Sequence, residues 1–252
     1  MAVLPHEGEF NILYGSYAVP VGSAFQPGYL ARPDQMGEYP GVLILPDIYG
    51  LTSLEKTMCR RLARHGMVAI AIDLYRENRP GPVGDLERAV VAYAHLDDRR
   101  ALTDIDDAYE FMMSDDVAWI VAGPIGIVGL DTGGRFGLLY ASDRPHVGAV
   151  VAVQAPLAGD EERELQVASV LERLTMPILG LYGRNDELVP SEGVDVAAGL
   201  NGTGTWILYE DTGHDFLNDG TDGYHAGAAD DAMVRIERFL AANLPSAVIP
   251  AY

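Results

Sequence analysis

Short apolar runs alternate with amphipathic stretches along most of this 252-residue chain. Two segments near the start, 11–20 and 24–31, have the pattern of an antiparallel strand pair. Later apolar runs predict strands at 42–45, 68–72, 125–128, 149–153, 178–182 and 206–209, and several of these are continuous β-branched runs, as expected for strands buried on both faces. Between them, amphipathic patterns predict helices near 53–65, 99–113, 135–142, 192–199 and 225–243. Such alternation is typical of an α/β fold with a doubly wound, mostly parallel sheet, whose ligands bind at the carboxyl ends of the strands.

The spacing of these elements predicts a single domain over residues 1–252, because the chain has no internal repeat, low-complexity tract or interdomain linker. Only about two dozen residues separate the strand ending at Val153 from Pro177, which is room for a loop and a short helix. A cap domain is therefore not expected. The Pro- and Gly-rich segment 80–84 predicts a rim loop, and the loops around Tyr49, 75–83 and 154–160 are expected to wall an open site.

Charge and cysteine content limit the possible binding partners and the cellular compartment. A formal net charge of −20, with no basic stripe to offset it, argues against nucleic acids and anionic membrane surfaces as partners. The single cysteine, Cys59, excludes an internal disulfide framework, and its helical context predicts a small buried residue. The N-terminus lacks the pattern of a signal peptide, and the apolar runs are only as long as strands. We expect a cytoplasmic protein, monomeric or homodimeric, that acts on a small molecule.

One turn has the pattern of an enzyme's nucleophile. A predicted strand and a predicted helix flank the segment 129–134, which reads GLDTGG. This is the arrangement of the G-x-S-x-G elbow, whose glycines leave room for a strained residue at the tip. The backbone N–H that follows the tip points at the bound substrate. The tip is ordinarily Ser or Cys, whereas here it is Asp131.

Two later loops supply the partners that a nucleophile needs. Asp186 follows the predicted strand 178–182, and His214 follows the predicted strand 206–209. The order nucleophile, acid, histidine is that of α/β-hydrolases and differs from the orders in chymotrypsin and subtilisin. Asp186 has an alternative role as a residue that caps its own loop, and His214 as a surface histidine. The order of the three segments favours a triad of Asp131, His214 and Asp186.

These motifs resemble those of the dienelactone hydrolase (carboxymethylenebutenolidase-like) family, and the resemblance covers nearly the whole chain. The family's G-x-C-x-G-G elbow corresponds to 129–134, with Asp131 at the Cys position. Its G-x-x-D-x-x-V-P acid loop corresponds to 183–190, and its G-H-x-F histidine loop to 213–216. Its strand–Glu–Ile–aromatic–Gly segment corresponds to 45–50, with Asp47 at the glutamate, and its later Asp-Leu-Tyr to 73–75. The resemblance implies an α/β-hydrolase fold and a hydrolase activity.

Two departures from the family's pattern bear on the chemistry. Asp131 replaces the thiol nucleophile, and Leu217 and Asn218 stand where the family places a carboxylate-binding Arg. The first departure affects the reaction, and the second affects the substrate. No His/Cys/Glu cluster has the spacing of metal ligands, and no glycine loop matches a dinucleotide or P-loop pattern. Neither a metal nor a cofactor is therefore expected.

An aspartate at the elbow favours some reactions over others. Its attack on an ester would give a mixed anhydride, which is no easier to reach than the ester itself. Its attack on a saturated carbon gives an alkyl ester on Asp131, which a water activated by His214 can hydrolyse while Asp186 orients the imidazole. Haloalkane dehalogenases and epoxide hydrolases resemble this chemistry. Those families use Trp or Tyr donors borne on a cap, and Thr132 stands where the dehalogenases carry Trp.

The sequence leaves three functions open. The first is hydrolysis through an alkyl ester at a carbon–halogen or epoxide centre. The second is ester or lactone hydrolysis in which Asp131 and His214 activate water directly. The third is a non-hydrolytic cyclase or ligand-binding protein that has lost the Cys or Ser nucleophile. Hydrolysis of a small molecule is the leading interpretation, because the acid, the histidine and the elbow are all present.

The remaining site residues come from the loops at the same strand ends. The backbone N–H groups of Ile48 and Thr132 are expected to form the oxyanion hole. Asp47, Tyr49 and Tyr75 are expected to contact the substrate. Asp47 has an alternative role as the cap of the helix that follows it. If it instead faces the site, the two carboxylates of Asp47 and Asp131 raise the pKa of one of them.

Overall fold

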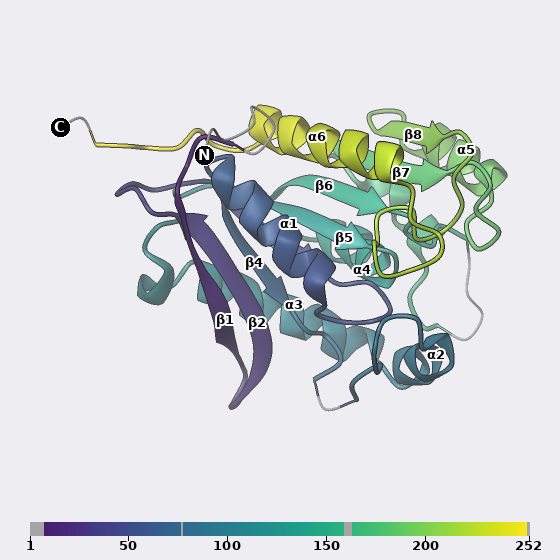
Figure 1. Cartoon of the computed structure of the whole chain (residues 1–252), viewed down its shortest axis with the longest axis horizontal. Coiled ribbons are helices and arrows are strands. Elements are labelled where there is room, and N and C mark those ends of the chain that lie inside the picture. The colour runs from purple at the N-terminus through teal and green to yellow at the C-terminus, as the bar shows by residue number, and fades with distance from the viewer. Residues whose placement is uncertain (1–7, 77, 159–162, 251–252) are drawn as a thin grey trace.

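The computed structural model describes residues 8–76, 78–158 and 163–250. Within these ranges eight strands form one sheet in the order β1-β2-β4-β3-β5-β6-β7-β8 (Figure 1). The strands are β1 (Ile12–Val21), β2 (Ala24–Pro33), β3 (Gly41–Leu45), β4 (Val68–Ile72), β5 (Ile125–Leu130), β6 (Val147–Val153), β7 (Ile178–Gly183) and β8 (Thr205–Tyr209). The β1–β2 and β2–β4 pairs are antiparallel, and all the others are parallel. The predicted mostly parallel sheet is confirmed.

Helices cover both faces of the sheet because the central strands are apolar on both sides. The helices are α1 (Ser53–Arg64), α2 (Leu86–Ala94), α3 (Asp98–Met112), α4 (Thr132–Ala141), α5 (Ser191–Leu200) and α6 (Ala226–Asn243). Successive side chains of a strand point to opposite faces. Val42 and Ile44 therefore pack in the core that α1 and α6 cover, whereas Leu43 and Leu45 pack in the core under α3 and α4. Figure 1 shows α1 and α6 in front of the sheet and α3 and α4 behind it.

The predicted strands and the five predicted helices are all present, and their bounds differ by a few residues at most. The sequence pattern missed α2. Its residues Leu86, Val90 and Val91 are exposed, so its apolar positions do not mark a buried face. Helix α4 begins at Thr132, earlier than predicted, directly after the turn residue Asp131. All of its residues are buried, so no polar face marks its first turn.

The connection between β6 and β7 contains two short 3₁₀ helices among its described residues, Val167–Ser169 and Leu171–Arg173, and no longer helix or strand. Residues 159 and 160 of the expected wall loop 154–160 lie outside the described residues. So do residues 1–7 of the N-terminal segment, which lacks the pattern of a signal peptide. Over the ranges that the structure covers, no helix is long and apolar enough to cross a membrane.

A buried ion pair fastens α4 to α3 behind the turn at Asp131. Both guanidinium Nη atoms of Arg135 donate to the Asp98 carboxylate, at 2.9 and 2.7 Å. Asp98 also accepts from the Leu165 backbone N–H at 3.1 Å and lies 3.4 Å from Arg163 Nη1. Because each charge is paired, burial does not leave an uncompensated ion. The helix that begins after Asp131 is therefore held in place from behind the sheet.

Candidate active site

Asp131 stands at the tip of a tight turn between β5 and α4. Its backbone has φ 44° and ψ −113°, a sparsely populated conformation that costs a residue with a side chain free energy. A Cβ atom at Gly129 would lie 2.4 Å from the Gly133 carbonyl oxygen, and one at Gly133 would lie 2.4 Å from the Leu45 carbonyl oxygen. Both positions require glycine. The turn presents the Asp131 carboxyl group at the carboxyl end of the sheet, with its side chain 14% exposed.

The loops after β7 and β8 bring Asp186 and His214 to the same edge of the sheet. His214 Nδ1 lies 2.8 Å from Asp186 Oδ2, and His214 Nε2 lies 3.7 Å from Asp131 Oδ1. The other oxygen of Asp186 accepts from the backbone N–H groups of Leu188 and Val189, each at 2.9 Å. Asp186 therefore fills both roles that the sequence left open, since one oxygen caps its own loop and the other orients the imidazole.

The two predicted oxyanion-hole donors contact Asp131 itself. The backbone N–H groups of Ile48 and Thr132 lie near its carboxyl group and favour its charged form. Ile48 lies in the loop after β3, and Thr132 is the first residue of α4. Because β3 and β5 are neighbours, these two N–H groups approach the same carboxyl group.

Burial and the neighbouring charges act in opposite directions on the pKa of each of the three side chains. Burial raises the pKa of Asp131 to about 6, although the nearby His214 and the hydrogen bond from Thr132 oppose the shift. Burial also disfavours the His214 cation, but its hydrogen bond to Asp186 and the charges of Asp131 and Asp186 outweigh this effect and raise its pKa to about 9. Burial raises the pKa of Asp186, but the bond and charge of His214, together with the backbone N–H groups of Val189 and Leu188, outweigh burial and lower it. Between about pH 6 and pH 9 the site thus holds an aspartate beside an imidazolium.

Asp47 faces the site and does not cap α1. The cap of that helix is Thr52, which forms a capping box with Glu55. One oxygen of Asp47 accepts from the Tyr49 backbone N–H at 2.8 Å, and the other accepts from Asn218 Nδ2 at 3.2 Å. Burial, followed by the charge of Glu55, raises the pKa of Asp47 well above its usual value, and the charge of Asp131 adds to the shift. Asn218, at the position of the family's Arg, therefore binds a carboxylate of the protein.

Tyr49 and Tyr75 lie in the wall of the site with their side chains buried. The Tyr75 hydroxyl lies 3.4 Å from Thr132 Oγ1, and the Tyr49 hydroxyl interacts with the backbone N–H of Gly84. Gly84 belongs to the predicted rim loop. In the same loop, Val83 packs against Gly220 of the loop that carries His214. The segment 80–84 therefore does border the site.

The cavity that reaches Asp131 is small. Its volume is about 10 Å³, measured as the space open to the centre of a water molecule, and its polar lining residues are Asp47, Asp131, Gln154, Asp215 and Asn218. The expected open cleft is therefore narrow at Asp131. Among the described residues, no group of three or more His, Cys, Asp or Glu side chains could hold a metal ion.

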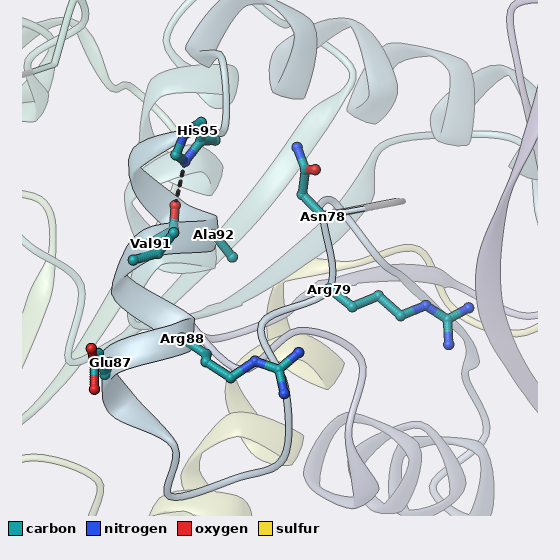
Figure 2. A pocket seen from close by; sticks show the side chains of 7 residues that line it. All are labelled: Asn78, Arg79, Glu87, Arg88, Val91, Ala92 and His95. Carbon is teal, nitrogen blue, oxygen red and sulfur yellow. Dashed lines mark hydrogen bonds between the residues drawn. The ribbon is translucent and has the colours of Figure 1, made fainter.

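A larger cavity of about 420 Å³ lies between α2 and the segment that carries Asn78 and Arg79, and no triad residue lines it (Figure 2). Figure 2 shows the Arg88 side chain reaching from α2 toward this segment, while Glu87 points away from it. The size of this groove does not make it the reaction centre, because Asp131, His214 and Asp186 contact one another elsewhere, at the edge of the sheet where the small cavity reaches Asp131.

Two residues of the small cavity were not named as site residues from the sequence, although Gln154 belongs to the predicted wall loop 154–160. Gln154 directly follows β6, and Asp215 directly follows His214. Both have positive φ angles, 54° and 62°. Its position along the chain could have identified Gln154 as a site residue. It directly follows β6, just as Asp131 directly follows β5, and ligands bind at the carboxyl ends of such strands.

The strand order, with its antiparallel second strand, and the placement of the three residues after β5, β7 and β8 are those of an α/β-hydrolase. Comparison with known proteins gives the family. The model of the Dienelactone hydrolase family matches residues 26–244, and the chain belongs to that family. It is a hydrolase of the carboxymethylenebutenolidase-like kind that acts on small molecules.

Individual relatives agree with this assignment. The chain is 33% identical over 236 residues to a protein of Escherichia coli (strain K12) named as a candidate carboxymethylenebutenolidase, covering 89% of this chain and 85% of the relative. A candidate 2-oxo-3-(5-oxofuran-2-ylidene)propanoate lactonase of Bradyrhizobium is 30% identical over 167 residues, which cover 65% of this chain and 66% of that protein. The crystal structure of a candidate dienelactone hydrolase from Klebsiella pneumoniae superposes with a TM-score of 0.83 at 28% identity, covering 92% of this chain and 99% of that one.

Proposed function

We propose that this hydrolase acts on a small molecule at a saturated carbon, through an ester formed on Asp131. The observation that supports this route is the contact of Ile48 and Thr132 N–H with the Asp131 carboxylate. A direct ester or lactone hydrolase needs such donors free for the substrate's carbonyl oxygen. An aspartate nucleophile needs them on its own oxygen, because that oxygen becomes the oxyanion when water attacks the enzyme ester.

In the first step an oxygen of the Asp131 carboxylate attacks the substrate carbon. With an epoxide, the carbon–oxygen bond of the ring breaks, and the released oxygen takes the proton from His214 Nε2. The products of this step are a hydroxyalkyl ester on Asp131 and a neutral imidazole. Asp186 accepts from Nδ1 and so keeps Nε2 turned toward the reacting atoms.

In the second step water attacks Cγ of the ester while His214 takes one of its protons. The oxyanion lies against the N–H groups of Ile48 and Thr132. When the ester bond breaks, the product oxygen takes the other water proton, and the Asp131 carboxylate and the His214 cation are restored. Esterification removes the Asp131 charge that helps to raise the pKa of His214, so a larger share of the imidazole is neutral and able to accept a proton.

Among saturated-carbon substrates, the geometry favours a small epoxide over a halide. Ring opening of an epoxide needs a proton, and His214 Nε2 is 3.7 Å from Asp131. Departure of a halide is helped by Trp or Tyr donors, and the Tyr75 hydroxyl already lies against Thr132. The small cavity at Asp131 restricts the reacting end of the substrate to a compact group.

The pH dependence of kcat/KM with propylene oxide checks the roles of the two charges. Attack needs Asp131 ionised, so the rate is expected to rise with pH up to about 6. Proton donation needs His214 charged, so the rate is expected to fall as pH rises through about 9. Asp186→Asn removes the carboxylate charge that helps to raise the His214 pKa. In this variant the fall of kcat/KM at high pH, the upper limb of the profile, should therefore move to lower pH. An upper limb that does not move would exclude His214 as the proton donor.

Single turnover in water enriched in oxygen-18 tests the ester route itself. With enzyme in excess over propylene oxide, the water oxygen enters the Asp131 carboxyl group, and the diol carries an unlabelled oxygen from the enzyme. Mass spectrometry of the peptide that contains Asp131 is expected to show the label. Label found only in the diol would reject the ester route.

The direct route is the second candidate, because the relatives named above are carboxymethylenebutenolidase-like and lactonase proteins. In that route Asp131 and His214 remove a proton from water, which attacks a lactone carbonyl. The oxygen-18 experiment separates the two routes, since the direct route never places a water oxygen in Asp131.

A further inference from the structure

Gln154 connects the two halves of the candidate site. It follows β6, lines the cavity beside Asp131 and is only 4% exposed. Its Nε2 donates to the carbonyl oxygen of Gly213, the residue before His214, at 3.3 Å. One side chain therefore contacts both the loop that carries the histidine and the space next to the nucleophile.

The bond to Gly213 also fixes the direction of the other end of the amide. A carbonyl oxygen accepts only from the NH₂ group, so Oε1 of Gln154 is turned away from Gly213. No donor among the described residues bonds to this oxygen. It is an acceptor in a residue more than nine-tenths buried, and that residue lines the cavity.

The cavity suits one water molecule. Its volume of about 10 Å³ and its polar lining are those of a site for a single ordered water, which needs two to four polar partners. Asp47 and Asn218 are already bonded to each other. Acceptors remain on Gln154, Asp131 and Asp215, and a water can donate to two of them at once.

We propose that Gln154 is a positioning residue for the water that hydrolyses the ester on Asp131. Its Nε2 holds the His214 loop through Gly213, and its Oε1 accepts one hydrogen of the water, so that the water oxygen faces Cγ of the ester. The water oxygen bonds to Cγ, one proton goes to His214, and the product oxygen leaves with the other. This inference rests on the proposed function, since it assigns the water of the second step.

Two substitutions test the role of the amide. Gln154→Met keeps the volume and removes both polar contacts, and Gln154→Gly removes the side chain while relaxing the backbone at φ 54°. Both are expected to lower kcat and KM for propylene oxide together by about 10²-fold, with kcat/KM unchanged. Both should also accumulate the ester on Asp131 in the steady state, detected by intact mass, because only the second step is slowed. Asp211→Gly, at an exposed residue with φ 57°, is the matched control and should keep full activity.

The outcomes separate this inference from the proposed function. A kcat for Gln154→Met equal to that of the unmodified protein overturns the inference, whatever the route. A fall in kcat without ester in any variant, including His214→Gln treated with bromoethane, whose bromide leaves without a proton, rejects the ester and leaves Gln154 positioning water for direct attack. A fall in kcat/KM, with no ester in either Gln154 variant while His214→Gln with bromoethane does accumulate it, shows a structural role and also overturns the inference.

Discussion

Replacing Asp131 by Asn is expected to lower kcat for propylene oxide hydrolysis by at least about 10³-fold. The amide keeps an oxygen for the N–H groups of Ile48 and Thr132, so the turn should hold its shape. It cannot attack carbon, because a neutral amide oxygen is a far weaker nucleophile than a carboxylate. The difference in kcat between the unmodified protein and Asp131→Asn should be largest at a pH between 6 and 9, where the carboxylate and the imidazolium coexist, and steady-state kinetics measure it.

The same substitution should not weaken the fold. The pKa of Asp131 is raised to about 6, so its ionised form is less favourable in the folded than in the unfolded chain. Above about pH 6 the carboxylate therefore lowers the stability of the folded state, and a neutral amide removes that cost. The thermal midpoint near pH 7 is expected to stay the same or rise.

A matched control lies in the neighbouring loop. Asp219 is exposed and lies five positions after His214, so Asp219→Asn also removes one negative charge without touching the site. It should keep full activity. If Asp131→Asn keeps more than a tenth of the activity, the carboxylate is neither nucleophile nor base, and the alternative of a cyclase or ligand-binding protein gains support.

The meeting of Asp131, Asp186 and His214 was predictable because each follows a strand. They stand just after β5, β7 and β8, and the parallel strands bring their carboxyl ends to one edge of the sheet. Apolar runs without alternation marked β5 and β7, since both faces of these strands are buried, whereas the edge strand β8 is only partly buried. No side-chain detail was needed for this step, which is why sequence reasoning reached it.

The role of Asp47 shows a signal that was present but unused. Thr52 and Glu55 have the T-x-x-E spacing of a capping box, which already assigns the cap of α1 to Thr52. The contact of Asp47 with Asn218 was beyond sequence reasoning, because the two residues are 171 positions apart and meet only through the packing of two loops. The absence of the family's Arg was visible, but the use of Asn218 in its place was not.

The approach of two N–H groups to Asp131 and the narrowness of the cavity depend on distances of a few tenths of an ångström. The sequence named Ile48 and Thr132 as expected donors, but not that they lie near the Asp131 carboxyl group. It also predicted an open site, whereas the cavity at Asp131 has room for about one water. The rim loop and the buried Tyr49 and Tyr75 fill the remaining space, and such packing has no periodic signature in a sequence.

His214→Gln is expected to trap the ester on Asp131. Bromoethane is the suitable probe, because bromide leaves without a proton and the first step does not then need the histidine. Attack by Asp131 gives an ethyl ester, and its hydrolysis should be slower by about 10²–10⁴-fold without the base. Intact-mass measurement should show one added ethyl group in place of a proton, and peptide mapping should locate it on Asp131.

The choice of probe makes the result specific. After correction for the intrinsic reactivity of each probe, the same variant should form its adduct more slowly with propylene oxide than with bromoethane. Ring opening of the epoxide needs a proton, and the variant lacks His214 Nε2, which lies 3.7 Å from Asp131 and would supply it. The double variant His214→Gln, Asp131→Asn should stay unmodified by both probes, which excludes labelling of other carboxylates. If His214→Gln stays unmodified while Asp131→Asn is inactive, Asp131 works as a base on water, and the direct route replaces the ester. If the adduct forms equally fast with both probes, the ester stands but His214 is not the acid of the first step.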